Sequence, residues 1–129
     1  MTDSPQRFAR SADELPTPAE VAALTGTEFM RGIASGRLTA APIAEHADTR
    51  LADVGDGQLV FEAEPRFAHY NPNGNILRPA FESTGPLRAT GRSVHAGRRT
   101  ATGDARLEDA DGRLYATGTT TCLVIELPQ

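Results

Sequence analysis

The stretch LRATGRSVHAGRRTATGDARLEDADGRLYATGTTTCLVI, residues 87–125, decides the fold of this chain. Two short turn sequences, GR at 97–98 and DADG at 109–112, divide it. Between the turns, small or apolar residues alternate with polar ones, which is typical of strands that bury one face. Consecutive strands joined by tight turns form an antiparallel meander. The predicted strands are 87–96, 100–108 and 114–125.

The face that these strands turn inward is made of unusually small side chains. Ala101, Gly103 and Ala105 alternate with polar residues in the middle strand, and Ala116 and Gly118 share one face of the last strand. A face without bulky side chains lets another element approach the sheet closely. We therefore expect a helix to pack against it.

A second hairpin is predicted upstream of the meander. Residues 46–54 and 58–64 flank the turn sequence Gly55-Asp56-Gly57 and show a period of two. In the second of these strands, Leu59 and Phe61 point to the same face. The sheet therefore has at least five predicted strands.

The N-terminal part predicts a helix over residues 18–34. It begins at Thr17-Pro18-Ala19-Glu20, where the threonine can cap the helix, proline suits its first turn and the glutamate completes a capping box. Gly32 lies inside this helix and weakens it by about 1 kcal/mol relative to alanine. Packing must therefore hold this helix more than its own propensity does.

Length and composition limit the class of protein. The chain has 129 residues, a formal net charge of −4 and 39% hydrophobic residues, which suits one domain, predicted over 17–127. Residues 1–16 are polar and aperiodic, and predict a tail or a loosely docked arm. The negative charge argues against a nucleic-acid partner, and no apolar run is long enough for a membrane. We expect a cytoplasmic protein, in which the single Cys122 excludes an intrachain disulfide.

Common catalytic constellations are not supported by the spacing. Ser93 and His95 are expected on one face of a strand, with Asp104 on the next strand, but no G-x-S-x-G sequence supports a serine triad. No metal site is expected, because the histidines have no Cys, Asp or Glu at ligand spacing. The histidines are His46, His69 and His95.

Two turns carry residues of chemical interest. Arg98 and Arg99, followed by Thr100, lie at a tight turn, where two guanidinium groups can grip a phosphate through bidentate bonds. A solvated turn is the alternative. The turn Asn71-Pro72-Asn73-Gly74 is ordinary in itself, although Pro72 can aim Asn71 at a functional partner.

The order of these segments resembles that of a known family. The capped helix is followed by APIAEHADTRLADVGDGQLVFEAEPRFAHYNPNG, residues 41–74, and then by residues 77–124. Together they resemble the hotdog-fold acyl-CoA thioesterases of the phenylacetate-pathway (PaaI-type) group. The likeness covers most of 18–125 and is strongest in GRLYATGTTTCLV, residues 112–124.

The resemblance implies an α+β fold in which an antiparallel sheet wraps around a long central helix and dimerises edge to edge. It implies hydrolysis of an acyl- or aryl-CoA thioester to the free acid and CoA, by a homodimer or homotetramer. No cofactor or metal beyond the substrate is implied. By residue, it assigns Asn71 to the thioester, and Arg98, Arg99 and Thr100 to the phosphates of CoA.

The sequence departs from the family in its middle. The family places His-Gly-Gly three residues after the glycine of N-P-x-G, at the start of the central helix, and an acidic residue within that helix. Here those positions hold Leu77, Arg78 and Pro79. We therefore expect the central helix to be missing. The concave face of the sheet is then filled by the predicted helix 18–34, covered by a partner chain, or left open in a chain of low stability. We favour the first of these combined with an oligomer.

Three functions remain open at this stage. The chain is a cytosolic acyl-CoA thioesterase by descent, a non-catalytic hotdog remnant that binds acyl-CoA or a partner subunit, or a small structural domain. Turnover lost on Asn71→Ala supports the first function. Salt-sensitive CoA binding without turnover supports the second. If the protein shows neither CoA binding nor turnover, the third function, a small structural domain, remains.

Overall fold

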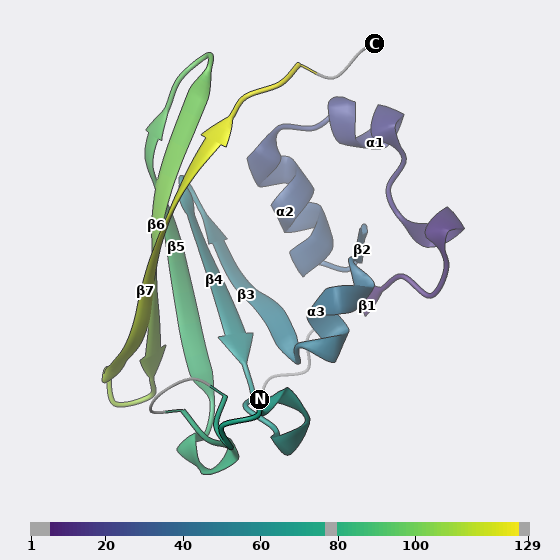
Figure 1. Ribbon diagram of the computed structural model, residues 1–129. Helices are drawn as coiled ribbons and strands as arrows, with labels where there is room; N and C mark the ends of the chain where they lie inside the picture. The colour runs from purple at the N-terminus through teal and green to yellow at the C-terminus, as the bar shows by residue number, and fades with distance from the viewer. Residues whose placement is uncertain (1–5, 77–79, 127–129) are drawn as a thin grey trace.

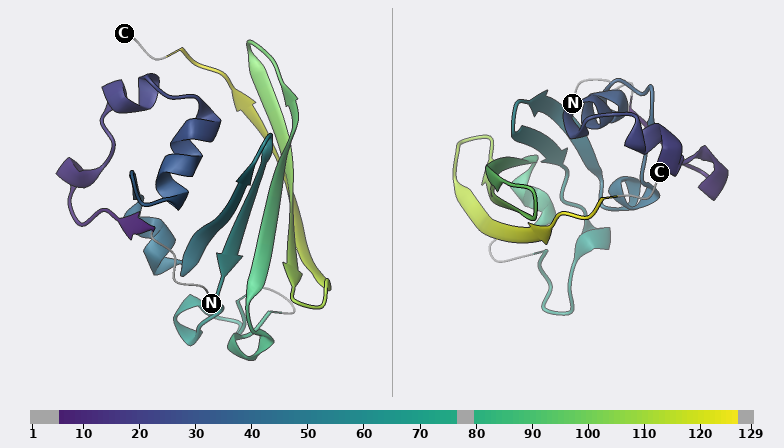
Figure 2. Two further views of the ribbon diagram at one scale, coloured as in Figure 1. Left: turned by 180° about the vertical axis from the view of Figure 1, so that it is seen from behind. Right: turned by 90° about the horizontal axis from the view of Figure 1, so that it is seen from above.

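The computed structural model describes residues 6–76 and 80–126 and contains a five-stranded antiparallel sheet beside a layer of short helices (Figure 1). The strands pair in the order β3-β4-β5-β6-β7, so every neighbour in the sheet is also a neighbour in sequence. The helices lie on one side of the sheet in all three views (Figures 1 and 2). The strands are β3 (Thr49–Gly55), β4 (Gln58–Ala63), β5 (Leu87–Ala96), β6 (Thr100–Asp109) and β7 (Leu114–Leu123).

The predicted meander is confirmed almost to the residue. β5, β6 and β7 each have ten residues, and the register places Ala105 opposite Gly118 and Leu107 opposite Ala116. Directly opposite residues share a face, so the small side chains line one face, as expected. The same face carries Phe61 of β4, through its pairing with Ala89 and the pairing of Ala89 with Leu107.

The upstream hairpin is also confirmed, although it begins later than predicted. Its first strand starts at Thr49 because α3 (Pro42–His46) occupies the residues before it. Proline at the first helical position favours this short helix. Asp48 connects α3 to β3 with φ 53°, in the left-handed region that non-glycine residues seldom adopt.

The predicted helix 18–34 is divided into α1 (Pro18–Ala22) and α2 (Gly26–Ala34). The capping box of Thr17 and Glu20 begins α1, as predicted. A second capping box, in which Thr25 and Glu28 exchange hydrogen bonds of 2.8 and 3.2 Å, begins α2. Thr25 has an extended backbone, so the helix cannot run through it. Sequence reasoning missed this second N-terminal signal.

The N-terminal arm docks on the helical layer. β1 (Arg7–Phe8) pairs in parallel with β2 (Thr39–Ala40), and a 3₁₀ turn, η1 (Ala12–Glu14), follows it. Ala9, which lies between β1 and η1 in the sequence, is buried, and its backbone N–H donates a hydrogen bond of 3.0 Å to the oxygen of Ala40. The described residues of the predicted tail are therefore held by backbone pairing and burial.

Residues 71–76 and 80–86, between the upstream hairpin and the meander, contain no α-helix. One 3₁₀ turn, η2 (Phe67–His69), precedes this connection, and a second, η3 (Glu82–Thr84), lies within it. The positions at which the resemblance would place His-Gly-Gly, 77–79, lie outside the described residues.

The core of the single chain is small. Among the described residues, no large side chain is fully buried. α2 packs chiefly on β3, at one side of the sheet. The buried apolar residues are Ala9, Leu38, Ala40, Leu51, Val60, Ala80 and Leu87. Large apolar side chains on or after β7 are exposed, including Leu123, which is 72% exposed. The chain thus leaves much apolar surface to solvent.

The position of Gly32 in α2 leaves no room for a side chain. A Cβ built on it would lie 2.8 Å from Cδ1 of the buried Leu38 and 2.8 Å from a nitrogen of Arg37. We expect Gly32→Ala to lower the free energy of unfolding by up to about 2 kcal/mol, because overpacking of about 1–3 kcal/mol exceeds the helix propensity gained. Gly26→Ala, where a Cβ meets nothing within 4 Å, is the matched control. Urea unfolding that shows equal stabilities for the two variants would contradict this account.

The capping boxes also predict how stability depends on pH. The pKa of Glu28 is lowered from the ordinary value of 4.5, first by the hydrogen bond from the Thr25 N–H, and the pKa of Glu20 is lowered in the same way by Thr17. A carboxylate whose pKa falls on folding stabilises the fold above its unfolded pKa, and this contribution disappears as pH falls through the folded pKa. Thermal melts should therefore show less loss of stability below pH 4.5 in Glu28→Gln than in the wild type. An identical slope in both would refute this cause.

Candidate functional site

Asn71 organises its own loop. Its Oδ1 accepts a hydrogen bond of 2.8 Å from the N–H of Asn73, and its Nδ2 donates to Oδ1 of Asn75 at 3.0 Å and to the oxygen of Ile76 at 3.4 Å. Its backbone is also paired, because its N–H donates to the oxygen of Asn75 and its oxygen accepts from Gly74. Both ends of the side-chain amide are thus used within the turn. An incoming carbonyl must displace Asn75 or Ile76 to receive a hydrogen bond from Asn71.

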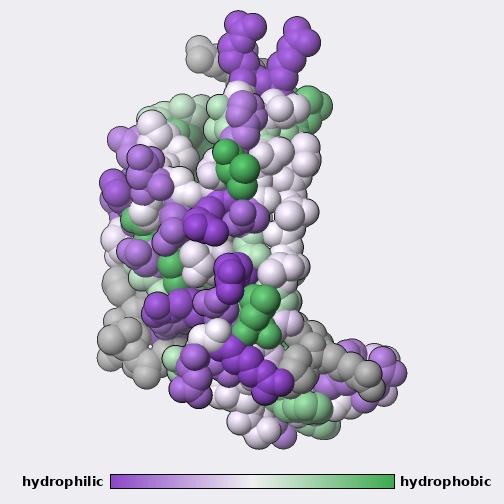
Figure 3. Space-filling view, turned by 90° about the vertical axis from the view of Figure 1, so that its left-hand side faces the viewer, coloured by the Kyte–Doolittle hydropathy of each residue, from purple (hydrophilic) through white to green (hydrophobic). Residues whose placement is uncertain are grey.

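Arg98, Arg99 and Thr100 lie together at the hairpin between β5 and β6. The hairpin is closed by the Gly97 N–H, 2.9 Å from the oxygen of Thr100, and the oxygen of Arg99 accepts from the Val124 N–H at 2.8 Å. Both arginines are exposed. Figure 3 shows strongly hydrophilic side chains protruding at the top, the end at which this hairpin lies in Figure 1. This arrangement suits an anion approaching from solvent.

The single chain does not bring these two groups together. The hydroxyl of Tyr70, the neighbour of Asn71, accepts a hydrogen bond from the Glu82 N–H shortly before β5 begins, and Arg98 follows the end of β5. A ten-residue strand is about 30 Å long, so the turn of Asn71 and the hairpin of Arg98 are at opposite ends of the sheet. The predicted thioester site and phosphate site are thus separated by about the length of a strand.

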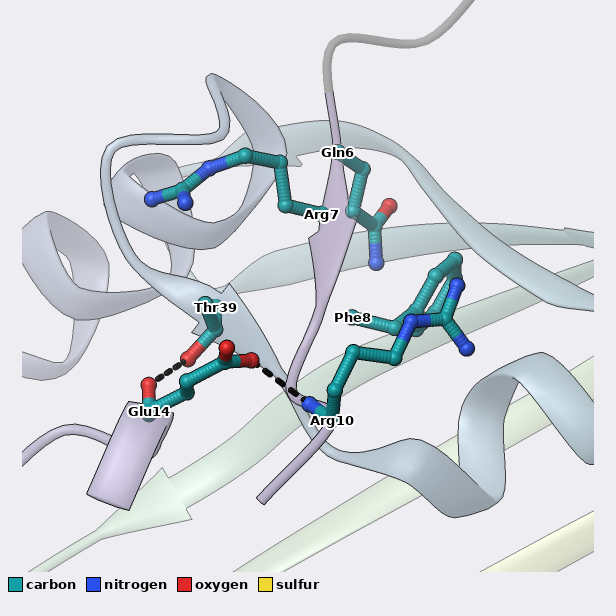
Figure 4. A pocket seen from close by; sticks show the side chains of 6 residues that line it. All are labelled: Gln6, Arg7, Phe8, Arg10, Glu14 and Thr39. Atoms are coloured by element: carbon teal, nitrogen blue, oxygen red, sulfur yellow. Dashed lines mark hydrogen bonds between the residues drawn. The ribbon is translucent and has the colours of Figure 1, made fainter. Parts of the chain in front are cut away.

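One cavity, of about 510 Å³, opens beside the N-terminal arm (Figure 4). Arg10 reaches Glu45 with contacts of 2.6 and 3.0 Å, and its N–H donates to Glu14 at 2.7 Å. Arg7 donates to the oxygen of Gly36 at 2.7 Å. The arginines at this cavity are therefore bonded to the protein and hold the arm in place. Its lining residues are Gln6, Arg7, Phe8, Arg10, Glu14 and Thr39, none of which was predicted as a site residue.

A second cavity, of about 450 Å³, lies at the end of the sheet that carries the turn between β6 and β7. Two of its carboxylates are paired: Glu62 with Arg88 at 3.0 Å and Glu108 with Arg106 at 2.8 Å. The pKa of Asp109 is lowered, first by the hydrogen bond from the Arg113 N–H. A carboxyl group whose pKa is lowered is a weaker general base. Asp109 is therefore not activated as a base in this cavity.

The predicted shared face of Ser93 and His95 is wrong. A bulge at Val94 places Ser93 opposite Gly103 and His95 opposite Thr102, which lie on opposite faces. One extra residue in a strand reverses the faces of all that follow. The expectation that these residues form no triad does not depend on that shared face.

A polar brace that sequence reasoning missed joins η2 to α3. The Nε2 of His69 lies 3.1 Å from the oxygen of His46, and the Nδ1 of His69 accepts from the Arg66 N–H at 3.2 Å. The Nε2 therefore carries the hydrogen. Arg66 also forms an ion pair with Asp48. The contacts of His69 with His46 and of Arg66 with Asp48 join segments that are distant in sequence, so no spacing signal could have found them.

Among the described residues, no group of three His, Cys, Asp or Glu side chains is placed to hold a metal ion. In the same part of the chain, no helix combines the length and apolarity that a bilayer span requires.

Comparison with solved structures finds proteins of the same fold. AziG from S. sahachiroi is 19% identical with a TM-score of 0.62, over 67% of this chain and 98% of that one. A phenylacetic acid degradation-related protein from Ralstonia eutropha is 23% identical with a TM-score of 0.59, over 74% of this chain and 96% of that one. The E. coli PaaI protein from the phenylacetic acid degradation operon is 15% identical with a TM-score of 0.53, over 64% of this chain and 83% of that one.

No protein family and no curated protein matches the sequence itself. The structural likeness, at identities of 13–23%, concerns the fold. The chain has the α+β, hotdog-like fold of these thioesterase-type structures, as its resemblance predicted.

Proposed function

We propose that this protein is an acyl-CoA thioesterase, which hydrolyses an acyl- or aryl-CoA thioester to the free acid and CoA. The observation that carries the proposal is the likeness of its fold to solved structures that include a thioesterase from Haemophilus influenzae and a protein of the thioesterase superfamily. The exposed arginine pair at the β5–β6 hairpin supports it, because CoA is rich in phosphate. The reaction uses water and needs no metal or further cofactor.

In the proposed reaction, water adds to the thioester carbonyl, the C–S bond breaks, and the thiolate of CoA takes up a proton. Negative charge develops on the carbonyl oxygen, and a hydrogen-bond donor aimed there is typically worth about 10²–10³ in rate. Asn71 would donate through Nδ2, exchanging its bond to the oxygen of Ile76, which at 3.4 Å is the longer of its two. Arg98, Arg99 and Thr100 would hold the phosphates of CoA.

A second function, binding of acyl-CoA or a partner subunit without turnover, is favoured by a specific observation. The amide of Asn71 is fully engaged in its turn, and Glu62 and Glu108 are paired with arginines. A site whose hydrogen-bond donor is engaged elsewhere can retain affinity but loses rate. We accordingly expect turnover to be slow.

Release of free CoA thiol from short acyl- and aryl-CoA substrates tests the proposal. We expect Asn71→Ala to lower the rate by about 10²-fold or more. Asn75→Ala is the matched control, since it removes the 3.0 Å bond within the turn but keeps the Asn71 amide. Loss in both variants would indicate a structural role for the turn. CoA binding without thiol release in the wild type would establish the second function instead.

The working form is proposed to be a cytoplasmic homodimer or homotetramer. The exposed apolar residues of β7 and the segment after it support association, because a single chain of this size rarely leaves such a surface uncovered.

A further inference from the structure

The β5–β6 hairpin carries cations that the rest of the chain leaves unpaired. Every arginine within β5 and β6 is paired with a carboxylate. These pairs are Arg88–Glu62 at 3.0 Å, Arg92–Asp104 at 3.6 Å and Arg106–Glu108 at 2.8 Å. Arg98 and Arg99, in the hairpin itself, form no side-chain hydrogen bond or ion pair with any described residue. Residues 93–103 contain no acidic residue, so the two guanidinium groups remain available to a ligand.

His95 lies beside the same hairpin, and a bulge decides which face of β5 it occupies. The bulge between Ser93 and His95 places His95 opposite Thr102. Without the extra residue, His95 would be opposite Ala101, on the other face of the sheet. Bulges re-aim side chains in this way beside functional sites. The His95 side chain is exposed and has no hydrogen-bond partner in the part of the chain that the structure describes.

Gly97 leaves room for the imidazole of His95 beside the arginines. A Cβ built on Gly97 would lie 3.0 Å from Nε2 of His95 and 3.7 Å from its Cε1. An alanine at this position would therefore push the ring away by a few tenths of an ångström. The Gly97 N–H also closes the hairpin through its 2.9 Å bond to the oxygen of Thr100. The imidazole thus lies against the residue that directly precedes Arg98.

We propose that His95 completes an anion site with Arg98 and Arg99, and that this site binds the 3′-phosphate of CoA. The inference rests on the proposed function, which supplies the ligand. A phosphate monoester has three free oxygens and carries about −1.5 to −2 charges at pH 7. Two guanidinium groups offer forked donors to such a group, and the imidazole adds a further N–H donor.

Three exposed donors grouped at the tip of a hairpin suit the phosphate monoester of CoA better than its diphosphate. The monoester projects from the ribose and ends in its free oxygens, so donors can approach it from several sides. The diphosphate lies within the length of the ligand and is substituted at both ends. The hairpin is therefore expected to distinguish CoA from dephospho-CoA, which lacks the 3′-phosphate.

Isothermal titration calorimetry with CoA and with dephospho-CoA tests the assignment. His95→Ala should raise the dissociation constant for CoA about fivefold or more, because a donor to a charged phosphate is lost, while solvent exposure limits the effect. Affinity for dephospho-CoA should not change. His46→Ala, which removes an exposed histidine from α3, is the matched control and should leave both affinities unchanged. Wild-type protein that binds CoA and dephospho-CoA equally tightly would overturn the proposal.

Gly97→Ala tests the position of the imidazole. It should raise the dissociation constant for CoA about threefold in the wild-type background, because the displaced ring loses its contact, and should have no effect in the His95→Ala background. A purely structural role of Gly97 would not produce this non-additivity. An equal loss in both backgrounds would mean that Gly97 acts through the hairpin backbone, and would overturn its role in positioning His95.

The imidazole signals of the three histidines, followed by NMR while CoA is added, provide a second test. The signals of His95 should shift, whereas those of His46 on α3 and His69 on η2 should stay in place. Dephospho-CoA should leave all three unchanged. Shifts of His46 or His69 without a shift of His95 would place the phosphate elsewhere and overturn the site.

Failure of this inference differs from failure of the proposed function. Thiol release from acyl-CoA, together with unchanged CoA affinity in His95→Ala, would overturn the inference and leave the function in place. CoA binding that depends on His95, without thiol release, would support the inference and establish binding without turnover. Wild-type protein that neither binds CoA nor releases thiol would overturn both.

Discussion

Replacing Leu51 by alanine should lower the free energy of unfolding by about 2–5 kcal/mol, the range typical of a buried leucine. Leu51 is 3% exposed and lies on β3, the strand against which α2 chiefly packs. Because few other apolar side chains are buried in this chain, the cavity cannot be filled by rearrangement of a larger core. A fall in Tm of roughly 10 °C or more is expected by calorimetry.

The matched control is Ile43→Ala in α3, which removes an aliphatic side chain that is 75% exposed. It should change the free energy of unfolding by less than about 0.5 kcal/mol. If Leu51→Ala were as mild as this control, the helical layer would not be held to the sheet through Leu51.

Replacing both Arg98 and Arg99 by alanine should raise the dissociation constant for CoA by about tenfold or more. Hydrogen bonds between guanidinium groups and phosphate are charge-assisted and stronger than neutral ones, although exposure weakens them. Wild-type binding should weaken as salt is raised from about 0.05 to 0.5 M, and the double variant should lose most of this dependence. Isothermal titration calorimetry measures both effects.

Arg113→Ala is the control for net charge. Arg113 is exposed on the β6–β7 turn, at the opposite end of β7 from the hairpin, and its guanidinium lies 5.5 Å from the centre of the Tyr115 ring. Its loss should leave CoA affinity within about twofold of wild type, because charges beyond a Debye length are screened. Equal weakening by Arg113→Ala and by the double variant would mean that overall charge, and not the hairpin, attracts CoA.

The strands and their turns were predictable because their signals are local. Alternation along 87–125 depends only on neighbouring residues, and it gave β5 without error and the ends of β6 and β7 within two residues. The capping box at Thr17 was also predicted from the sequence. The same motif at Thr25 was overlooked, and with it the break between α1 and α2.

The candidate site was less predictable because its properties depend on distance in space. The turn of Asn71 and the hairpin of Arg98 were each placed correctly in loops, but the distance between them depends on how the folded sheet holds the two loops. The bulge at Val94 likewise reversed a predicted face, since a register shift requires knowledge of the paired strand. The brace between His69 and His46 depends on the packing of η2 against α3.

The sequence by itself determined the antiparallel meander, its face of small side chains, the capped start of the first helix and the resemblance to a thioesterase-type fold. These features depend on hydrophobic periodicity, turn residues and capping residues, all of which are local in the sequence. Only the tertiary structure decided that the side-chain amide of Asn71 is bonded within its own turn, that the arginine hairpin lies a strand's length away, and that β7 forms one edge of the sheet. These properties arise from contacts between segments far apart in the chain, whose geometry depends on the registers and packing of the whole sheet.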